Sequence, residues 1–315
     1  MQSVYYSIVL GSCFHTYNGS ASEKLGYRSG SCIYWNMLEV NRVSKKFNAR
    51  QVLNGLSFQL QPGEITTLIG GNGSGKTTTF RLILNFLDPD EGSIRFEDRP
   101  VENCDVCYLC EQRSLYQDCS VYDQLRLSAQ LSGIRHYRPV IDRWLDELRL
   151  SPLKQEIIGR LSKGNQQKVA LASSLIKDAP LVIMDEPFTA LDRENIALFI
   201  RIMENLRSQG KTVLVSSHIY QPVKEICDHY LLLDKGRISV DLTRKQLHDD
   251  ARRMIVVSSL FEPEEESLLA EEQNEEGENV RYVFTDRKKA RRMLKEAFEK
   301  DEDVTYRHCR IEDFQ

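Results

Sequence analysis

The sequence lacks long hydrophobic runs. None of its apolar stretches approaches the roughly 18 to 20 residues that a membrane-spanning helix needs. The N-terminus contains a short apolar run, but its first basic residue is Lys24, so the basic segment that opens a secretory signal is missing. We therefore expect a cytosolic protein whose association with a membrane is peripheral.

The sequence also lacks a marked excess of either charge. Its 42 Lys and Arg residues nearly balance its 46 Asp and Glu residues, which gives a net charge of −4. Proteins that bind nucleic acid electrostatically carry a basic footprint, so we expect no nucleic-acid partner. With 41% apolar and 28% charged residues, the 315-residue chain has the composition of one large globular domain and a smaller one.

Cysteines are too sparse for a disulfide scaffold, since there are eight in the whole chain. Cys104, Cys107 and Cys110 are spaced three apart, as metal ligands often are. The segment between them has the pattern of a short strand, in which a step of three residues turns the side chain to the opposite face. We interpret these cysteines as ordinary buried or loop thiols, with a metal site as the alternative.

The pattern along the chain divides it into three parts. Residues 1–36 are rich in Ser, Gly and Tyr without periodicity, which predicts a disordered N-terminal extension; a translation start at Met37 is the alternative. Residues 37–245 alternate strand-like and helical runs, which is typical of a mainly parallel sheet flanked by helices. Strand signals are missing between about 113 and 180, which predicts a helical insert. The strands are expected in "EITTLIG", "PLVIMDE", "TVLVSSH" and "HYLLLDKGRI".

Residues 246–315 predict a small α/β appendage. Strands are expected in "RRMIVVSS", "RYVFTD" and "VTYRHCRI", and a helix in "RKKARRMLKEAFEK" at 287–300. The Glu-rich segment at 262–279 between the first two strands predicts a solvated loop.

The stretch "GGNGSGKT" fits the phosphate-loop pattern G-x-x-x-x-G-K-[ST], with a strand before it and a helical pattern after it. In this motif backbone N–H groups surround phosphate, the lysine (Lys76) reaches the β- and γ-phosphates of a nucleotide, and the hydroxyl of Thr77 ligates Mg²⁺. The expected nucleotide-binding residues here are Gly70, Gly71, Asn72, Gly73, Ser74, Gly75, Lys76, Thr77 and Thr78.

A second motif, "LVIMDEP", combines a buried strand with two carboxylates at its end. Asp185 is positioned to hold a magnesium shell, and Glu186 to orient or deprotonate an attacking water. Together the two motifs predict an ATP-hydrolysing site.

A third motif, "LSKGNQQK", is polar and contains a glycine, so it cannot fill a core. The three motifs together resemble the ATP-binding cassette (ABC) family over residues 37–240, whose signature is written LSGGQ. Ser162 and Gly164 match this signature, whereas Lys163 and Asn165 resemble the variant of ABC-2-type exporters. The resemblance implies a P-loop NTPase fold with an antiparallel β part, and an ATP bound between one chain's phosphate loop and another chain's signature. An ordinary helix cap by Ser162 is the alternative.

The resemblance also assigns single residues. Phe47 takes the place of the aromatic that stacks on adenine, with a core role as its alternative. The metal-sensing glutamine position holds Glu111, with Gln112 next, so either residue is a candidate. Asp192 matches the loop that crosses the dimer interface. His218 matches the switch histidine that contacts the γ-phosphate, and a structural histidine is the alternative.

These assignments predict the ATPase subunit of an ABC exporter, with ATP and Mg²⁺ as ligands. The resemblance implies a separate transmembrane permease, a homodimer or a paired ABC ATPase, and a location at the cytoplasmic face of the membrane. The ending "RIEDFQ" is similar to that of export cassettes for drugs, antibiotic peptides and sodium ions. The alternatives are a soluble ABC ATPase in translation or DNA repair and a small-molecule kinase, which would leave "LSKGNQQK" unexplained.

Overall fold

The structure is a computed structural model of the whole chain, and most of the predicted cassette is described. The described residues are 37–48, 50–71, 73–111, 115–189, 191–217 and 226–246, with the strands at 255–259, 268–273, 280–284 and 305–308. The predicted N-terminal extension and the helix expected at 287–300 lie outside the described residues.

A six-stranded sheet in the order β5-β6-β7-β3-β8-β9 forms the centre of the cassette. Its strands are β3 (Ile65–Ile69), β5 (Val106–Leu109), β6 (Leu181–Asp185), β7 (Thr212–Ser217), β8 (His229–Asp234) and β9 (Arg237–Thr243). The pairs β5/β6, β6/β7 and β7/β3 are parallel. Every residue of β3, β6 and β7 is buried, as in parallel sheets that are covered on both faces. The predicted α/β class with a mainly parallel core is confirmed.

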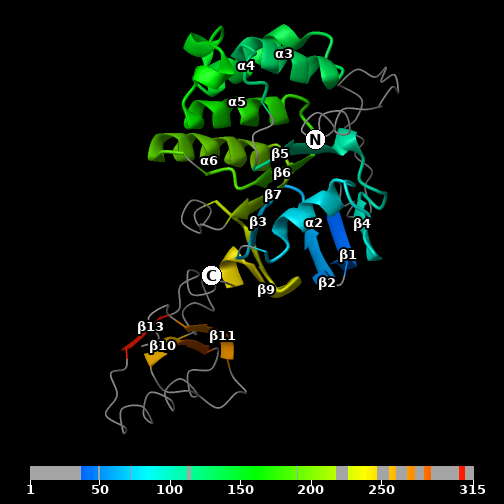
Figure 1. Cartoon of the computed structure of the whole chain (residues 1–315), viewed down its shortest axis with the longest axis vertical. Coiled ribbons are helices and arrows are strands. Elements are labelled where there is room, and N and C mark those ends of the chain that lie inside the picture. Colours follow the sequence, from blue (N-terminus) through cyan, green and yellow to red (C-terminus); the bar gives the residue numbers. More distant parts are fainter. Residues whose placement is uncertain are drawn as a thin grey trace, which may run out of the picture. The chain divides into compact units, whose positions relative to one another are not determined.

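Helix α2 follows β3, helix α6 connects β6 to β7, and three other helices belong to the predicted helical insert. Their bounds are α2 (Lys76–Ile83), α3 (Val121–Leu131), α4 (Tyr137–Glu147), α5 (Lys163–Leu175) and α6 (Arg193–Ser208). Short 3-10 turns occur at 103–105, 151–153 and 158–160. Figure 1 shows α3, α4 and α5 together in green beyond α6, while α2 lies next to β1 and β2. The motif "LSKGNQQK" therefore lies at the start of α5, within the helical insert.

An antiparallel sheet in the order β2-β1-β4 forms the second β part of the cassette. Its strands are β1 (Leu38–Phe47), β2 (Arg50–Leu60) and β4 (Glu91–Phe96). β4 approaches β1 very closely at Gly92, which has φ 86°; a Cβ there would lie 2.4 Å from the carbonyl oxygens of Asn41 and Arg42. Only glycine fits this position without displacing β1.

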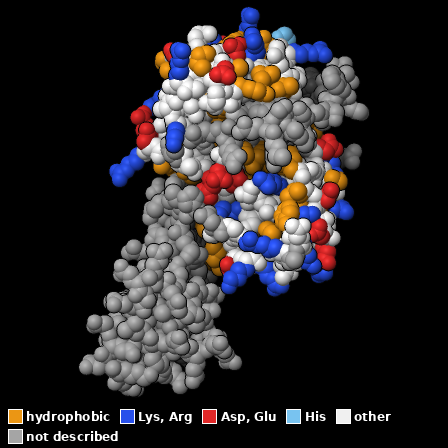
Figure 2. Space-filling view, viewed as in Figure 1, with side chains coloured by type: hydrophobic (Ala, Val, Ile, Leu, Met, Phe, Trp, Pro, Cys, Tyr) orange, Lys and Arg blue, Asp and Glu red, His pale blue; other side chains and the backbone are white. Residues whose placement is uncertain are grey.

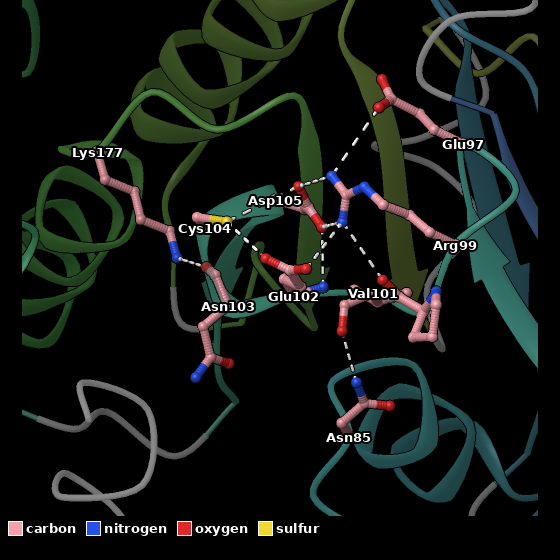
Figure 3. A network of polar contacts seen from close by, with 10 residues as sticks. Asn85, Glu97, Arg99, Val101, Glu102, Asn103, Cys104, Asp105 and Lys177 are labelled. Atoms are coloured by element: carbon pink, nitrogen blue, oxygen red, sulfur yellow. Dashed lines mark hydrogen bonds and ion pairs between the residues drawn. The ribbon is translucent and has the colours of Figure 1, made fainter. Parts of the chain in front are cut away.

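A polar network fixes the segment between the antiparallel sheet and β5 (Figure 3). The guanidinium of Arg99 donates two hydrogen bonds of 2.7 Å to the buried carboxylate of Asp105. This carboxylate also accepts a 2.8 Å bond from the backbone N–H of Glu102, and Lys177, after α5, donates to the carbonyl of Asn103. Bidentate Arg–carboxylate pairs are rigid, so the network ties this connection to the central sheet and to the end of α5.

The described surface has no single sign of charge on the face drawn in Figure 2, where Lys and Arg side chains are interspersed with Asp and Glu. No helix in the described part of the chain is both long enough and apolar enough to cross a bilayer.

The run "HYLLLDKGRI" is not a single strand as predicted, because β8 ends at Asp234 and β9 begins at Arg237. The two residues between them, Lys235 and Gly236, have φ 45° and 79°. Positive φ at both central positions is the geometry of a tight hairpin turn. A Cβ on Gly236 would lie 2.2 Å from the carbonyl oxygen of Val52, so the turn also requires glycine.

The C-terminal region contains a four-stranded antiparallel sheet in the order β11-β12-β10-β13. Its strands are β10 (Ile255–Ser259), β11 (Leu268–Gln273), β12 (Val280–Phe284) and β13 (Thr305–His308). β11 lies in the Glu-rich segment predicted to be a loop, and for residues 268–273 this prediction is wrong: backbone pairing with β12 outweighs the acidic composition. The chain divides into two compact units, residues up to 227 with 233–239, and 228–232 with 240 onward. The boundary at residue 245 stays a prediction.

Candidate nucleotide site

The phosphate loop joins the buried strand β3 to the N-terminus of α2. Gly75 is the N-cap of this helix with φ 115°, and no side chain caps the helix. A Cβ on Gly75 would lie 2.7 Å from Cδ2 of Leu53, and one on Gly70 would lie 2.6 Å from the carbonyl oxygen of Leu233. The loop therefore packs closely on its neighbours, while its uncapped N–H groups suit an anion.

Lys76 is buried at the first position of α2 and is directed back into the loop. Its ammonium donates to the carbonyl of Gly70 at 2.5 Å and to that of Gly71 at 3.4 Å. Both of these acceptors are neutral carbonyls, and within the described part of the chain the ammonium forms no ion pair with a carboxylate. A phosphate oxygen would give the ammonium a stronger, charge-assisted acceptor.

The loop opens into a pocket of about 600 Å³. The pocket brings together residues from four distant parts of the sequence, and it is lined by Phe47, Arg50, Val52, Gly71, Gly73, Gly75, Lys76, Thr77, Thr78, Glu111, Asp185 and Glu186. Ten of the predicted site residues are in this set. A volume of this size is in the range of ordinary ligand pockets.

Phe47 is 43% exposed, so the alternative of a core phenylalanine is excluded. Gly70 and Ser74 belong to the loop but do not line the pocket, and the buried hydroxyl of Ser74 has no hydrogen-bond partner among the described residues. Asn72, Gln112 and His218 lie outside the described residues.

The carboxylates Asp185 and Glu186 stand at the carboxyl end of β6. Glu186 has φ 49°, in the left-handed region that a residue with a side chain rarely adopts. Its backbone N–H donates to the hydroxyl of Ser216 at 2.9 Å, and this hydroxyl donates to Oδ1 of Asp185 at 2.5 Å. Strained backbone of this kind is concentrated at functional sites.

Burial raises the pKa of Asp185 above its usual range, and the nearby carboxylates of Glu111 and Glu186 raise it further. The hydrogen bond from Ser216 and the charge of Lys76 act in the opposite direction. An ionised Asp185 is therefore disfavoured by its surroundings, and a cation in the pocket would relieve this cost.

The residues present fit Mg²⁺ that arrives with a nucleotide. Thr77, Glu111 and Asp185 all line the pocket, but no group of three His, Cys, Asp or Glu side chains in the described part of the chain could hold a metal by itself. Mg²⁺ usually takes one or two carboxylates and completes its octahedron with substrate phosphates and water.

The three cysteines with metal-ligand spacing differ in their surroundings: Cys107 is buried, Cys104 is exposed and Cys110 is intermediate.

The signature residues Ser162 and Gly164 do not line the pocket. Ser162 is exposed and is the N-cap of α5, where its hydroxyl accepts a 3.3 Å hydrogen bond from the N–H of Asn165. Further along the helix, the buried Gln167 donates to the carbonyl of Pro187 at 3.2 Å. The signature helix is thus attached to the segment after Glu186, while its N-cap Ser162 and its first residue Lys163 are exposed. Asp192 is likewise exposed, as the N-cap of α6.

Sequence reasoning missed Arg50, Val52 and Ser216. Arg50 and Val52 line the pocket from β2, and their only signal was their position shortly after Phe47. Ser216 is a polar residue directly after the apolar run Val213–Val215 of a buried strand, which was a visible signal.

Comparison with known proteins identifies the family. The protein family described as ABC transporter matches residues 53–189. An uncharacterized ABC transporter ATP-binding protein of Methanocaldococcus jannaschii is 35% identical over 225 residues, which cover 71% of this chain and 82% of that protein. The Nod factor export ATP-binding protein I of Burkholderia pseudomallei is 28% identical over 231 residues, covering 71% of this chain and 73% of its own length. A solved structure of the ATP-binding subunit of an ABC transporter has a TM-score of 0.62 at 30% identity and covers 69% of this chain and 92% of that one.

The fold, the pocket and these relatives define an ABC-type ATPase. The chain belongs to the ABC transporter family, as one of its ATP-binding proteins. Members of this family bind and hydrolyse ATP, so the predictions of an ATP ligand, an ATP-hydrolase activity and a role in transport are confirmed.

Proposed function

We propose that this protein is the ATPase subunit of an ABC-2-type exporter, that it dimerises on ATP, and that it drives a separate membrane permease from the cytoplasmic face of the membrane. The observation that carries the proposal is the separation of two motif sets within one chain. The phosphate loop, Asp185 and Glu186 share one pocket, whereas Ser162 and Gly164 do not line it, and Ser162 is exposed. A second chain is needed to bring a signature to this ATP.

The roles of the pocket residues in this proposal follow from their chemistry. Phe47 offers an exposed ring for the adenine to stack on, and the N–H groups of the phosphate loop with Lys76 bind the β- and γ-phosphates. Mg²⁺, when bound through Thr77, Asp185 and Glu111, supplies positive charge at the phosphate oxygens. His218, which lies outside the described residues, has the proposed role of the switch histidine at the γ-phosphate, on the ground of its resemblance to the family motif.

Hydrolysis requires one activated water. The carboxylate of Glu186 accepts a hydrogen bond, and then a proton, from a water whose oxygen attacks the γ-phosphorus. The bond from the γ-phosphorus to the oxygen bridging to the β-phosphorus breaks, and ADP and inorganic phosphate result. The left-handed backbone at Glu186 holds its side chain at the pocket rather than along the strand.

Export rather than import is supported by a relative that is named as an export protein and by the ending "RIEDFQ". A soluble ABC ATPase in translation or repair is less well supported, because the relatives described above are transporter proteins.

The test is the variant Glu186→Gln, which keeps the phosphate-binding groups and removes the carboxylate that acts on water. We expect ATP hydrolysis to fall by at least about 100-fold, while ATP affinity stays within a few-fold of wild type. With hydrolysis blocked, size-exclusion chromatography in ATP should show a dimer, with the permease present where dimerisation requires it. A variant that hydrolyses ATP at the wild-type rate would remove Glu186 from the mechanism.

A further inference from the structure

Ser216 is a fully buried polar residue on the strand next to the two site carboxylates. It is 0% exposed, and its backbone is in register with Asp185 where β7 pairs with β6. The three residues before it on the same strand, Val213, Leu214 and Val215, are apolar and fully buried. A hydroxyl at such a position costs free energy unless it is hydrogen-bonded, so its partners indicate why it is there.

The hydroxyl of Ser216 acts both as a donor and as an acceptor. Its O–H donates to Oδ1 of Asp185 at 2.5 Å, and its oxygen accepts the backbone N–H of Glu186 at 2.9 Å. One side chain therefore contacts two consecutive residues through different groups: the carboxylate of the first and the peptide of the second.

The bond to the Glu186 peptide has a mechanical consequence. The left-handed φ of Glu186 is unfavourable for a residue with a side chain, and a hydrogen bond to its N–H helps to hold this conformation. The direction in which the Glu186 side chain leaves the strand depends on this peptide. At the same time the bond to Oδ1 fixes one oxygen of Asp185 and leaves the other for a ligand in the pocket.

We propose that Ser216 is a positioning residue for ATP hydrolysis, which sets the orientation of both Asp185 and Glu186 without touching the nucleotide. This inference rests on the proposed roles of these two carboxylates. It goes beyond them because it couples the magnesium-holding group and the water-activating group through one hydroxyl.

The experiment compares Ser216→Ala, which removes only the hydroxyl, with Ser216→Thr, which keeps it. The matched control is Thr67→Val on the adjacent strand β3: the hydroxyl of Thr67 is also buried but has no hydrogen-bond partner among the described residues. The measurements are kcat, KM for ATP, the Mg²⁺ concentration that gives half-maximal hydrolysis, ATP affinity in EDTA, and Tm.

We expect Ser216→Ala to lower kcat by about 10- to 100-fold and to raise the required Mg²⁺ concentration, as is typical when a partner of a metal ligand is lost. KM and ATP affinity in EDTA should change little, because the phosphate loop is untouched. Ser216→Thr should recover most of the kcat and the Mg²⁺ dependence, and Thr67→Val should match the wild type in both.

Two results would overturn the inference. One is a Ser216→Ala protein with wild-type kcat and Mg²⁺ dependence while Glu186→Gln is inactive, which would leave the proposed function intact. The other is an equal loss in Thr67→Val, which would indicate a general packing effect. If Ser216→Ala does not fold, Ser216→Cys replaces it, and wild-type kcat in that variant would equally contradict the role of the hydroxyl.

Discussion

Two helix N-termini in this chain, those of α2 and α5, carry motifs that are predicted to contact the phosphates of ATP, and their structures differ. The N-terminus of α2 follows a glycine N-cap, has no side-chain cap and opens into a pocket with Lys76 at its first position. The N-terminus of α5 is capped by Ser162, has the exposed Lys163 at its first position, and lies outside that pocket.

The difference indicates that the α2 terminus can bind phosphate within one chain, whereas the α5 terminus is already capped by its own side chain. The uncapped α2 has unsatisfied N–H groups where an anion fits, so it is ready to bind without a partner. At α5 the hydroxyl of Ser162 already satisfies one N–H of its own helix. The cap that was the alternative explanation of Ser162 is therefore present, and it is compatible with a second use of this residue when another molecule presents its phosphates.

The largest effect expected from this comparison is on ATP binding. Lys76→Ala removes the ammonium of the phosphate loop and should weaken ATP binding by the isolated chain by about 10- to 100-fold, the range for losing hydrogen bonds to a charged group. Ser162→Ala should leave this affinity unchanged, because Ser162 is outside the pocket. Titration with a fluorescent ATP analogue measures both, and an equal loss in Ser162→Ala would contradict the separation of the two sites.

Mixing the two variants tests whether the signature serves another chain. Each variant homodimer has two damaged sites, and we expect both to be inactive. A mixed head-to-tail dimer has one intact site, which combines the phosphate loop of the Ser162→Ala chain with the signature of the Lys76→Ala chain. We expect mixing to restore measurable ATP hydrolysis, with the permease present where dimerisation requires it.

The control for this experiment is a tagged pull-down that proves the mixed dimer. Mixed dimers without any hydrolysis would count against a signature that completes a partner's site.

The smallest effects concern stability. Gly75→Ala forces a Cβ onto a residue with φ 115° and into Leu53, and should lower the free energy of unfolding by about 1 to 3 kcal/mol. Gly164 lies in the first turn of α5, where alanine is the better helix former. Gly164→Ala should therefore raise the free energy of unfolding by up to about 1 kcal/mol. The same variant should lower ATP hydrolysis. Thermal or urea unfolding checks the two signs, and destabilisation by Gly164→Ala would contradict the helical role.

The sequence was most informative where a motif and its strand or helix are adjacent in the chain. The phosphate loop needs only β3 before it and α2 after it, and Asp185 needs only the apolar run of β6, so local pattern was sufficient for both. The hairpin at Lys235 and Gly236 was not predicted, although "DKG" is a turn signal. The apolar run before it favoured a single continuous strand.

Features that depend on distant partners could not be predicted. β11 becomes a strand by pairing with β12 rather than by its composition. Arg50 lines the pocket because β2 lies next to the phosphate loop, and Ser216 contacts Asp185 because β7 pairs with β6. Neither adjacency is encoded within a short window of sequence.

The order of strands in the central sheet also has a consequence for the time at which the ATP site forms. β3, which leads into the phosphate loop, is made early in synthesis, yet its neighbours are β7 and β8, and Ile65 pairs with Val213. Pairing over such a long stretch of chain is slow and must wait for the later strands. While the ribosome is still synthesising the helical insert, β3 lacks both of its neighbours in the central sheet, so the complete ATP pocket forms only after β6 and β7 have emerged.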